Sequence, residues 1–173
     1  MKEYLKKNYK LILIKLAIVV VALAIDLLSK HFLQKYFLNG GSDITIIKGV
    51  LSLTYTENEG VAWGLFSGKT VGIVITSVVF VIILLVWDYF NTNKNPLNFI
   101  GFSFILSGAI GNFVDRIFLG YVRDFISFDF INFPIFNFAD ICITIGCVLY
   151  VIYVLFIYTK KPKKEGEDEK PQN

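Results

Sequence analysis

Four aspartates stand at or beside the ends of strongly apolar segments, where a carboxylate is costly. They are Asp26, Asp115, Asp124 and Asp140. A carboxylate beside a long apolar run loses hydration, so it needs hydrogen-bond partners or a chemical role. Two such groups held together cannot both ionise easily, and they share a proton. One then acts as a base toward water and the other as an acid toward a leaving nitrogen, which predicts hydrolysis of a peptide bond.

Asp124 and Asp140 are the candidates for this pair. Asp124 lies in a mostly apolar stretch, and Asp140 is followed by a long apolar run. The two are 16 positions apart, and Phe133 and Pro134 turn the chain between them. A loop of that length is able to bring the carboxylates together. We favour a functional role for Asp140 over a structural one, because an isolated structural carboxylate at that position is costly.

Two asparagines are placed to hold these carboxylates. Asn112 precedes Asp115 and Arg116 by three and four positions, so all three side chains can share one helix face. Asn137 precedes Asp140 by three positions in the same way. We expect the asparagines to donate hydrogen bonds to buried carboxylates. Hydrogen bonding between helices is the competing role.

Asp26 and Lys30 are four positions apart in the order that favours an ion pair along a helix. Two interpretations stay open for this pair. It either reaches the membrane interface as an ion pair at a helix end, or it forms the polar floor of a site.

Four apolar segments must position these groups. Hydrophobic residues make up 55% of the 173 residues and charged residues 18%, which is too apolar for a soluble domain of this size. Each segment is close to the roughly 20 residues that a helix needs to cross a bilayer. Ser103, Ser107 and Gly111 form a small-residue face for close helix packing. The predicted spans are about 11–28, 71–87, 97–114 and 135–158.

The predicted fold is an all-α membrane protein with four transmembrane helices and a small extracytoplasmic β-sheet. Lysines cluster at the two ends of the chain, which predicts cytoplasmic termini and places the aspartates near the outer face. Residues 40–66 include an alternating pattern typical of strands, and residues 120–133 are predicted to form an apolar loop at the interface. Residues 1–159 are predicted to form a single domain, and residues 160–173 a disordered tail.

Several other classes of function fit the sequence poorly. The one histidine, His31, gives a metal site or a His-based triad little to work with. Cys142 and Cys147 match no zinc or redox spacing. The sequence has neither a Gly-rich phosphate loop nor a basic stripe with aromatics. We therefore expect no cofactor, no metal and no nucleic-acid partner.

Three rival interpretations remain beside the aspartic one. A peptidase that uses Ser29 and Lys30 is disfavoured, because adjacent helical residues point about 100° apart. A transporter or channel with a path of acids would need polar groups across the whole membrane, and the second span offers none. A scaffold without chemistry would leave four costly acids at one layer without a purpose.

Five blocks, in order, resemble the lipoprotein signal peptidases, the type II signal peptidases of bacteria. They are DLLSK from Asp26, NEGVAWG from Asn58, GAIGNFVDR from Gly108, GYVRDF from Gly120 and FPIFNFAD from Phe133. Each block alone would be weak, and their common order on independently predicted spans makes the resemblance specific.

The resemblance implies an aspartyl endopeptidase of the bacterial cytoplasmic membrane. Its substrate would be a prolipoprotein with a diacylglyceryl group on a cysteine, cut just before that cysteine. Membrane lipid would be a further partner, and we expect a monomer. The resemblance makes Asp124 and Asp140 catalytic. It gives supporting or substrate-binding roles to Asn58, Gly60, Asn112, Arg116 and Asn137, beside Asp26, Lys30 and Asp115 from the residue patterns above.

Overall fold

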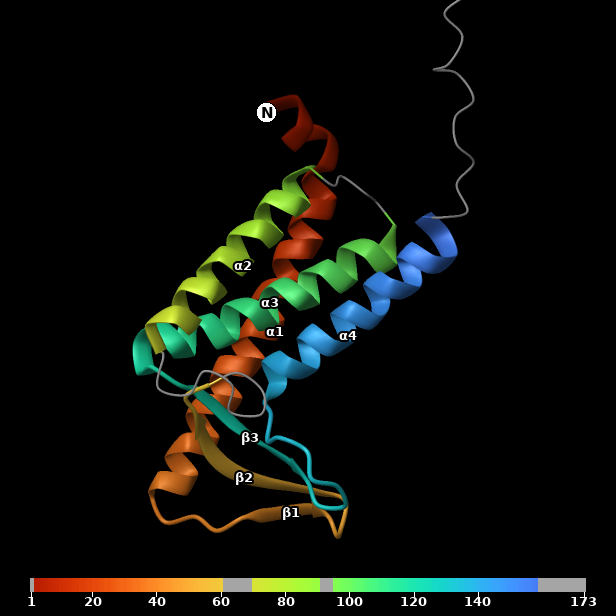
Figure 1. Ribbon diagram of the computed structural model, residues 1–173. Helices are drawn as coiled ribbons and strands as arrows, with labels where there is room; N and C mark the ends of the chain where they lie inside the picture. Colours follow the sequence, from red (N-terminus) through yellow and green to blue (C-terminus); the bar gives the residue numbers. More distant parts are fainter. Residues whose placement is uncertain (1, 61–69, 91–94, 159–173) are drawn as a thin grey trace, which may run out of the picture.

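The computed structural model describes residues 2–60, 70–90 and 95–158 (Figure 1). Among these residues it contains four long helices and three strands. The helices are α1 (Lys2–Leu38), α2 (Thr70–Phe90), α3 (Pro96–Leu119) and α4 (Phe138–Tyr153), which a π-helical turn at Val154–Tyr158 continues. The strands are β1 (Ile44–Ile47), β2 (Leu51–Asn58) and β3 (Val122–Phe128). The predicted tail at 160–173 lies outside the described residues.

The helices carry apolar side chains on their outer surfaces. Exposed residues include Leu16 and Val20 on α1, Ile82 on α2 and Val148 on α4. Three stretches of the described residues are long and apolar enough to cross a membrane: Asn8–Leu38, Pro96–Leu119 and Phe138–Tyr158. Helix α2 is 21 residues long and has an apolar stretch from Ile75 to Asp88. An apolar exterior on a helical bundle is what a lipid environment requires, and the predicted fold class is confirmed.

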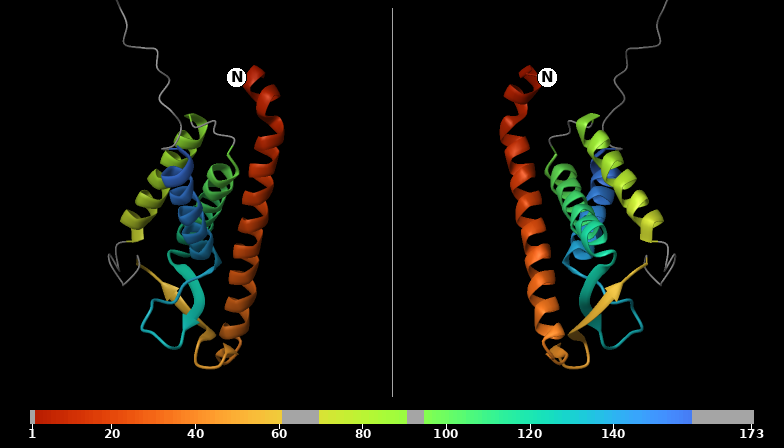
Figure 2. Two further views of the ribbon diagram at one scale, coloured as in Figure 1. Left: turned by 90° about the vertical axis from the view of Figure 1, so that its right-hand side faces the viewer. Right: turned by 90° about the vertical axis from the view of Figure 1, so that its left-hand side faces the viewer.

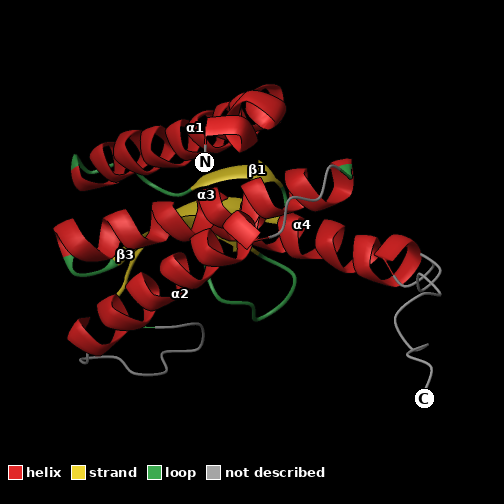
Figure 3. Cartoon of the chain, turned by 90° about the horizontal axis from the view of Figure 1, so that it is seen from above, coloured by secondary structure: helices red, strands yellow, loops and turns green. Residues whose placement is uncertain are grey.

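Helix α3 lies at the centre of the bundle. Viewed from above, it lies between α1 and α2 and packs along α4 (Figure 3). Glycines allow this close approach, because a Cβ on Gly108 would overlap the Ala139 carbonyl and one on Gly146 would overlap the backbone at Gly101. The helix begins at the N-cap Asn95, whose side chain accepts a hydrogen bond from Leu97 N at 3.0 Å.

Helix α1 is longer than the predicted first span. The prediction ended that span near Leu28, but the helix continues to Leu38. Asp26 and Lys30 do not end the helix, because both side chains face the bundle and are buried among polar partners. The part of α1 beyond the bundle runs beside the sheet (Figure 2).

The three strands form an antiparallel sheet in the order β1-β2-β3. Thr56 on β2 pairs with Asp124 on β3, and Asn58 pairs with Val122. The predicted β segment is confirmed at β1 and β2, and residues 61–66 lie outside the described part of the chain. The prediction for 120–133 was incomplete, because this segment contains β3 as the third strand rather than only a loop.

Helix α4 begins three residues later than the predicted fourth span. Phe136 pairs with Ile126 as an isolated bridge, and the Phe136 N–H donates to the Ile126 carbonyl at 3.0 Å. This backbone pairing holds the chain extended up to the N-cap Asn137. The start of α1 and the end of α4 lie at one end of the bundle, and the sheet lies at the opposite end (Figure 2).

Candidate active site

The start of α4 fixes Asp140 through a reciprocal cap. The Asn137 side chain accepts from the Asp140 N–H, and the Asp140 carboxylate accepts from the Asn137 N–H, each at 3.1 Å. Such a capping box satisfies two amides that the first helical turn leaves unpaired. The other Asp140 oxygen accepts from the Asn112 amide of α3 at 2.7 Å. Asp140 is therefore held by its own helix and by the neighbouring one.

Strand β3 supplies Asp124. Its carboxylate accepts from the Asn137 amide at 2.6 Å and from the Asn58 amide at 2.8 Å. Asn58 comes from β2, two positions along the paired strand from Thr56, which lies opposite Asp124. Asp124 is only 2% exposed, so these amides replace most of the water around its carboxylate.

Asn137 joins the two carboxylates. Its side-chain amide donates to Asp124, and its backbone N–H donates to Asp140. The same side-chain amide donates to the Asn112 oxygen at 3.0 Å, which closes a network across α3, α4 and β3. The structure brings Asp124 and Asp140 together on one polar cluster, although they come from different elements.

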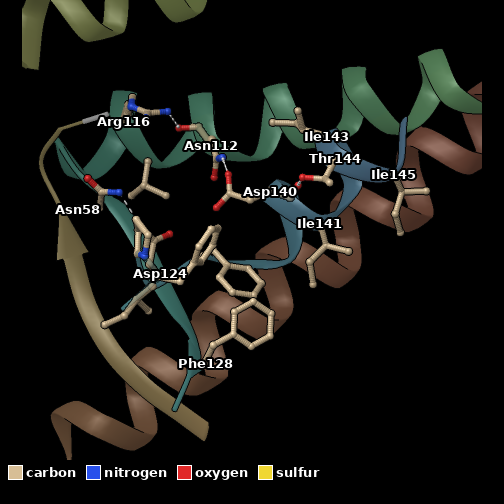
Figure 4. A pocket seen from close by; sticks show the side chains of 15 residues that line it. Asn58, Asn112, Arg116, Asp124, Phe128, Asp140, Ile141, Ile143, Thr144 and Ile145 are labelled. Carbon is tan, nitrogen blue, oxygen red and sulfur yellow. Dashed lines mark hydrogen bonds between the residues drawn. The ribbon is translucent and has the colours of Figure 1, made fainter. Parts of the chain in front are cut away.

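Both carboxylates line one pocket of about 520 Å³. Its polar side chains gather on one side, and isoleucines of α4 lie along the other (Figure 4). Such an amphipathic cleft suits a ligand that has one polar group and an apolar body. Its lining consists of Asn58, Asn112, Arg116, Val122, Asp124, Phe128, Phe133, Pro134, Ile135, Phe136, Asp140, Ile141, Ile143, Thr144 and Ile145.

The surroundings of Asp124 raise the pKa of its carboxyl group. The pKa of its carboxyl is raised to about 6, chiefly by burial and also by the nearby Asp140 charge, although the hydrogen bonds from Asn58 and Asn137 act in the opposite direction. The positive charge of Lys30 also lowers this pKa. A carboxyl with a pKa near 6 is a usable acid at near-neutral pH.

Lys30 is buried next to this polar cluster. Its ammonium lies 2.8 Å from the Asp26 carboxylate and 3.5 Å from that of Asp115, and it donates to the Asn112 oxygen at 3.0 Å. Asp26 in turn accepts from the Ala139 N–H at 2.9 Å, which ties α1 to the start of α4. Lys30 is fully buried, so the alternative of an ion pair reaching the membrane interface was wrong.

Asp115 and Arg116 bind different partners, although both were predicted to share one helix face with Asn112. Arg116 lies beside the pocket and donates to the carbonyls of Gly60 and Asn112 at 3.4 Å. The Gly60 N–H donates to the Asn58 side chain at 3.0 Å, so Gly60 lies at the edge of the cluster. Asp115 turns away, toward Arg123 and Lys30.

Arg123 is a residue that the sequence analysis missed. Its guanidinium binds Asp115 at 2.6 and 3.2 Å and donates to the Gln34 side chain at 3.3 Å. The available signal was its position beside Asp124 in the GYVRDF block. The aromatic wall of Phe128, Phe133 and Phe136 was also unassigned.

The rival Ser29 and Lys30 pair is not arranged for catalysis. The Ser29 hydroxyl donates to the Asp26 carbonyl at 2.8 Å, in the manner of a helical serine. The Lys30 ammonium is held by Asp26, Asn112 and Asp115 instead. Among the described residues, no group of three or more His, Cys, Asp and Glu side chains is arranged as a metal site.

Comparisons with known proteins identify the family of this chain. The family described as "Signal peptidase (SPase) II" matches residues 18–156. A lipoprotein signal peptidase of Lactobacillus johnsonii is 43% identical over 120 residues, which cover 69% of this chain and 78% of that protein. One of Enterococcus faecalis is 41% identical over 128 residues, which cover 74% and 78% of the two chains.

Solved structures have the same fold. A bacterial membrane enzyme determined in meso at 2.3 Å resolution superposes with a TM-score of 0.76 at 30% identity, over 88% of this chain and 94% of that one. A second, at 1.9 Å resolution, gives a TM-score of 0.71 at 32% identity, over 83% and 93%. Family, fold and apolar helices together show a multi-pass membrane protein, and the chain belongs to the signal peptidase II family of proteases.

Proposed function

We propose that this chain removes the signal peptide from diacylglyceryl-modified prolipoproteins, with Asp124 and Asp140 as the catalytic pair. The observation that carries the proposal is the amide of Asn137, which binds Asp124 while the backbone of the same residue binds Asp140. Two carboxylates on one pocket wall can activate a water and protonate a leaving group without a cofactor.

We assign different roles to the two aspartates from their surroundings. Asp140 lies in the first turn of α4, where the helix N-terminus favours a negative charge, so it is the base. Asp124 is more deeply buried and has a pKa near 6, so it is the acid. Asp140 takes a proton from water as the oxygen attacks the scissile carbonyl. Asp124 gives a proton to the leaving nitrogen as the carbon–nitrogen bond breaks.

The remaining groups of the site position the substrate. Arg116 and Asn58 lie on the pocket wall, where they can bind carbonyl oxygens of an extended peptide. The isoleucines and phenylalanines of the same pocket fit apolar side chains of the signal peptide or the acyl chains of the modified cysteine.

The architecture supports a site at the outer membrane face. The lysine-rich ends of the chain favour cytoplasmic termini. The start of α1 and the end of α4 lie together, and the sheet with Asp124 lies at the opposite end (Figure 2). We infer one peptidase domain over residues 1–159 that acts as a monomer, since the described residues of one chain supply both carboxylates and their amide partners. The lipid-modified cysteine would lie near the headgroup layer, within reach of this pocket.

The test is cleavage of a purified diacylglyceryl-modified precursor and of its unmodified twin. We expect cleavage of the modified precursor alone, with the new N-terminus at the lipid-bearing cysteine. Equal cleavage of both would contradict the assigned substrate class. No cleavage of either, by protein shown to be folded, would contradict the proposed activity.

A further inference from the structure

Arg123 occupies an unusual position beside the proposed acid. It directly precedes Asp124 on β3, but it is not among the described residues that line the pocket. Its guanidinium turns toward the bundle and meets Asp115 of α3, whose side chain is fully buried. A guanidinium directed away from the pocket does not contact the substrate, so its role must act through other residues.

The contact between Arg123 and Asp115 is a bidentate fork. Nε lies 3.2 Å from one carboxylate oxygen, and Nη2 lies 2.6 Å from the other. The backbone N–H of Arg123 also donates to Asp115, at 3.1 Å. Because Asp115 binds both the side chain and the backbone, it fixes the strand at the residue next to Asp124.

Arg123 also reaches α1, through Gln34. The guanidinium donates to the Gln34 oxygen at 3.3 Å, and the Gln34 amide donates to the hydroxyls of Tyr55 and Tyr121 at 3.0 and 3.1 Å. The strand that carries Asp124 is thereby held by polar contacts to both α1 and α3.

Asp115 extends the same chain of contacts to the proposed base. It lies 3.5 Å from the Lys30 ammonium, which donates to the Asn112 oxygen. The Asn112 amide then donates to Asp140 at 2.7 Å. A continuous set of contacts therefore runs from Arg123 through Asp115, Lys30 and Asn112 to Asp140.

We propose that Arg123 is a positioning residue that sets the distance between Asp124 on the strand and Asp140 on the helix. The inference rests on the proposed function. Asp115 is the point where the two halves of the site meet, because it binds Arg123 on one side and Lys30 on the other.

Arg123→Gln tests this role, with Arg123→Lys as the conservative variant and Lys48→Gln as the matched control on an exposed turn of the same sheet. We expect kcat of Arg123→Gln to fall about 100-fold, since a misplacement of about 1 Å costs that much. KM should stay unchanged, because Arg123 does not line the pocket. Arg123→Lys should recover part of kcat, since lysine keeps the charge but cannot form the fork. Lys48→Gln should match the unmodified protein.

The pH profile separates positioning from loss of folded protein. Without Arg123 the Asp115 charge is less compensated and the amide bonds to Asp124 loosen, so both effects raise the pKa of Asp124. The alkaline limb of the kcat/KM profile should therefore move to higher pH in Arg123→Gln. Misfolding alone would lower the amplitude and leave the limb in place. The charged groups that act on Asp124 are Asp140 on α4, Lys30 on α1 and Arg116 on α3, while Asp115 is paired with Arg123 and Lys30 and the exposed Glu57 on β2 binds Tyr55.

A double-mutant comparison completes the test. Asp115→Asn and Arg123→Gln act on one contact, so the double variant should be little worse than the more damaging single variant. Fully additive losses, or an unchanged kcat in Arg123→Gln, would overturn the positioning role while the unmodified protein remained active. An unmodified protein that fails to cleave the lipidated precursor would overturn the proposed function and this inference together.

Discussion

The two halves of the site are held in different ways. Asp140 is fixed by a capping box within four consecutive residues, to which one amide from α3 is added. Asp124 has no comparable local support, and its partners Asn58 and Asn137 lie 66 and 13 positions away. The helix half therefore forms with the helix itself. The strand half depends on the register of β2 with β3 and on the contacts of Arg123.

The largest expected effect comes from removing either carboxylate. Asp124→Asn and Asp140→Asn each keep the side-chain volume but remove the acid–base function, and we expect kcat to fall by about 10³-fold or more. Cleavage of the lipidated precursor is the measurement, and Asp43→Asn on the exposed surface of the same end is the control. If either variant kept normal turnover, the aspartate that it replaces would not belong to the catalytic pair.

Asn137→Ala should damage both halves at once, because it removes the amide on Asp124 and the cap of α4. Loss of an N-cap lowers the free energy of unfolding by about 1 kcal/mol, and kcat should fall as well. Asn58→Ala touches the strand half alone, so it should lower kcat with less effect on stability. Thermal unfolding in detergent and precursor cleavage distinguish the two, with the exposed Asn132→Ala as the control. Equal stability of both variants would contradict the capping role.

The pH dependence of kcat/KM should report on the strand half of the site, because it follows the titration of Asp124. Because Asp124 must be protonated to act as the acid, kcat/KM should fall as the pH rises through an apparent value of about 6. Asn58→Ala removes a bond that favours the carboxylate, so the pKa rises and this alkaline limb moves to higher pH. If the acidic limb moved to higher pH instead, Asp124 would be the base and the assigned roles of the two aspartates would be reversed.

The smallest expected effect is that of metal removal. Neither half of the site needs an ion in the proposed mechanism, since the two carboxylates and one water supply the chemistry. Dialysis of the purified protein against a chelator should leave the rate of precursor cleavage unchanged. A loss of activity that added Zn²⁺ or Mg²⁺ restored would require a metal-dependent step.

The same contrast explains what could be predicted from the sequence. The pairing of Asp26 with Lys30 follows from helical spacing and was predicted. Contact between Asn137 and Asp140 was also expected from their spacing, but it is a capping box in which the Asn137 side chain accepts from the Asp140 N–H, and the Asn137 amide donates to Asp124 instead. The polar ends of the apolar segments also indicated that the aspartates gather at one face. These features are local, so a single sequence carries them.

Long-range pairing accounts for what the sequence analysis missed. The segment after α3 forms β3 because β2 offers its edge, and an apolar stretch such as FISF does not reveal that partner. Asp115 and Arg116 were predicted to share a helix face with Asn112, but Asp115 binds Arg123 of the strand, a partner that helical spacing does not reveal. The continuation of α1 past Lys30 depends on buried partners from α3. Each of these outcomes depends on a residue far away in the chain.

The central claim is that Asp124 and Asp140 work as one unit on a single bond. The most direct measurement is kcat for cleavage of the lipidated precursor by Asp124→Asn, Asp140→Asn and the double variant. We predict a near-complete loss in each single variant and almost no further loss in the double variant, as expected for groups that act together. Substantial turnover by either single variant, with protein shown to be folded, would contradict the claim.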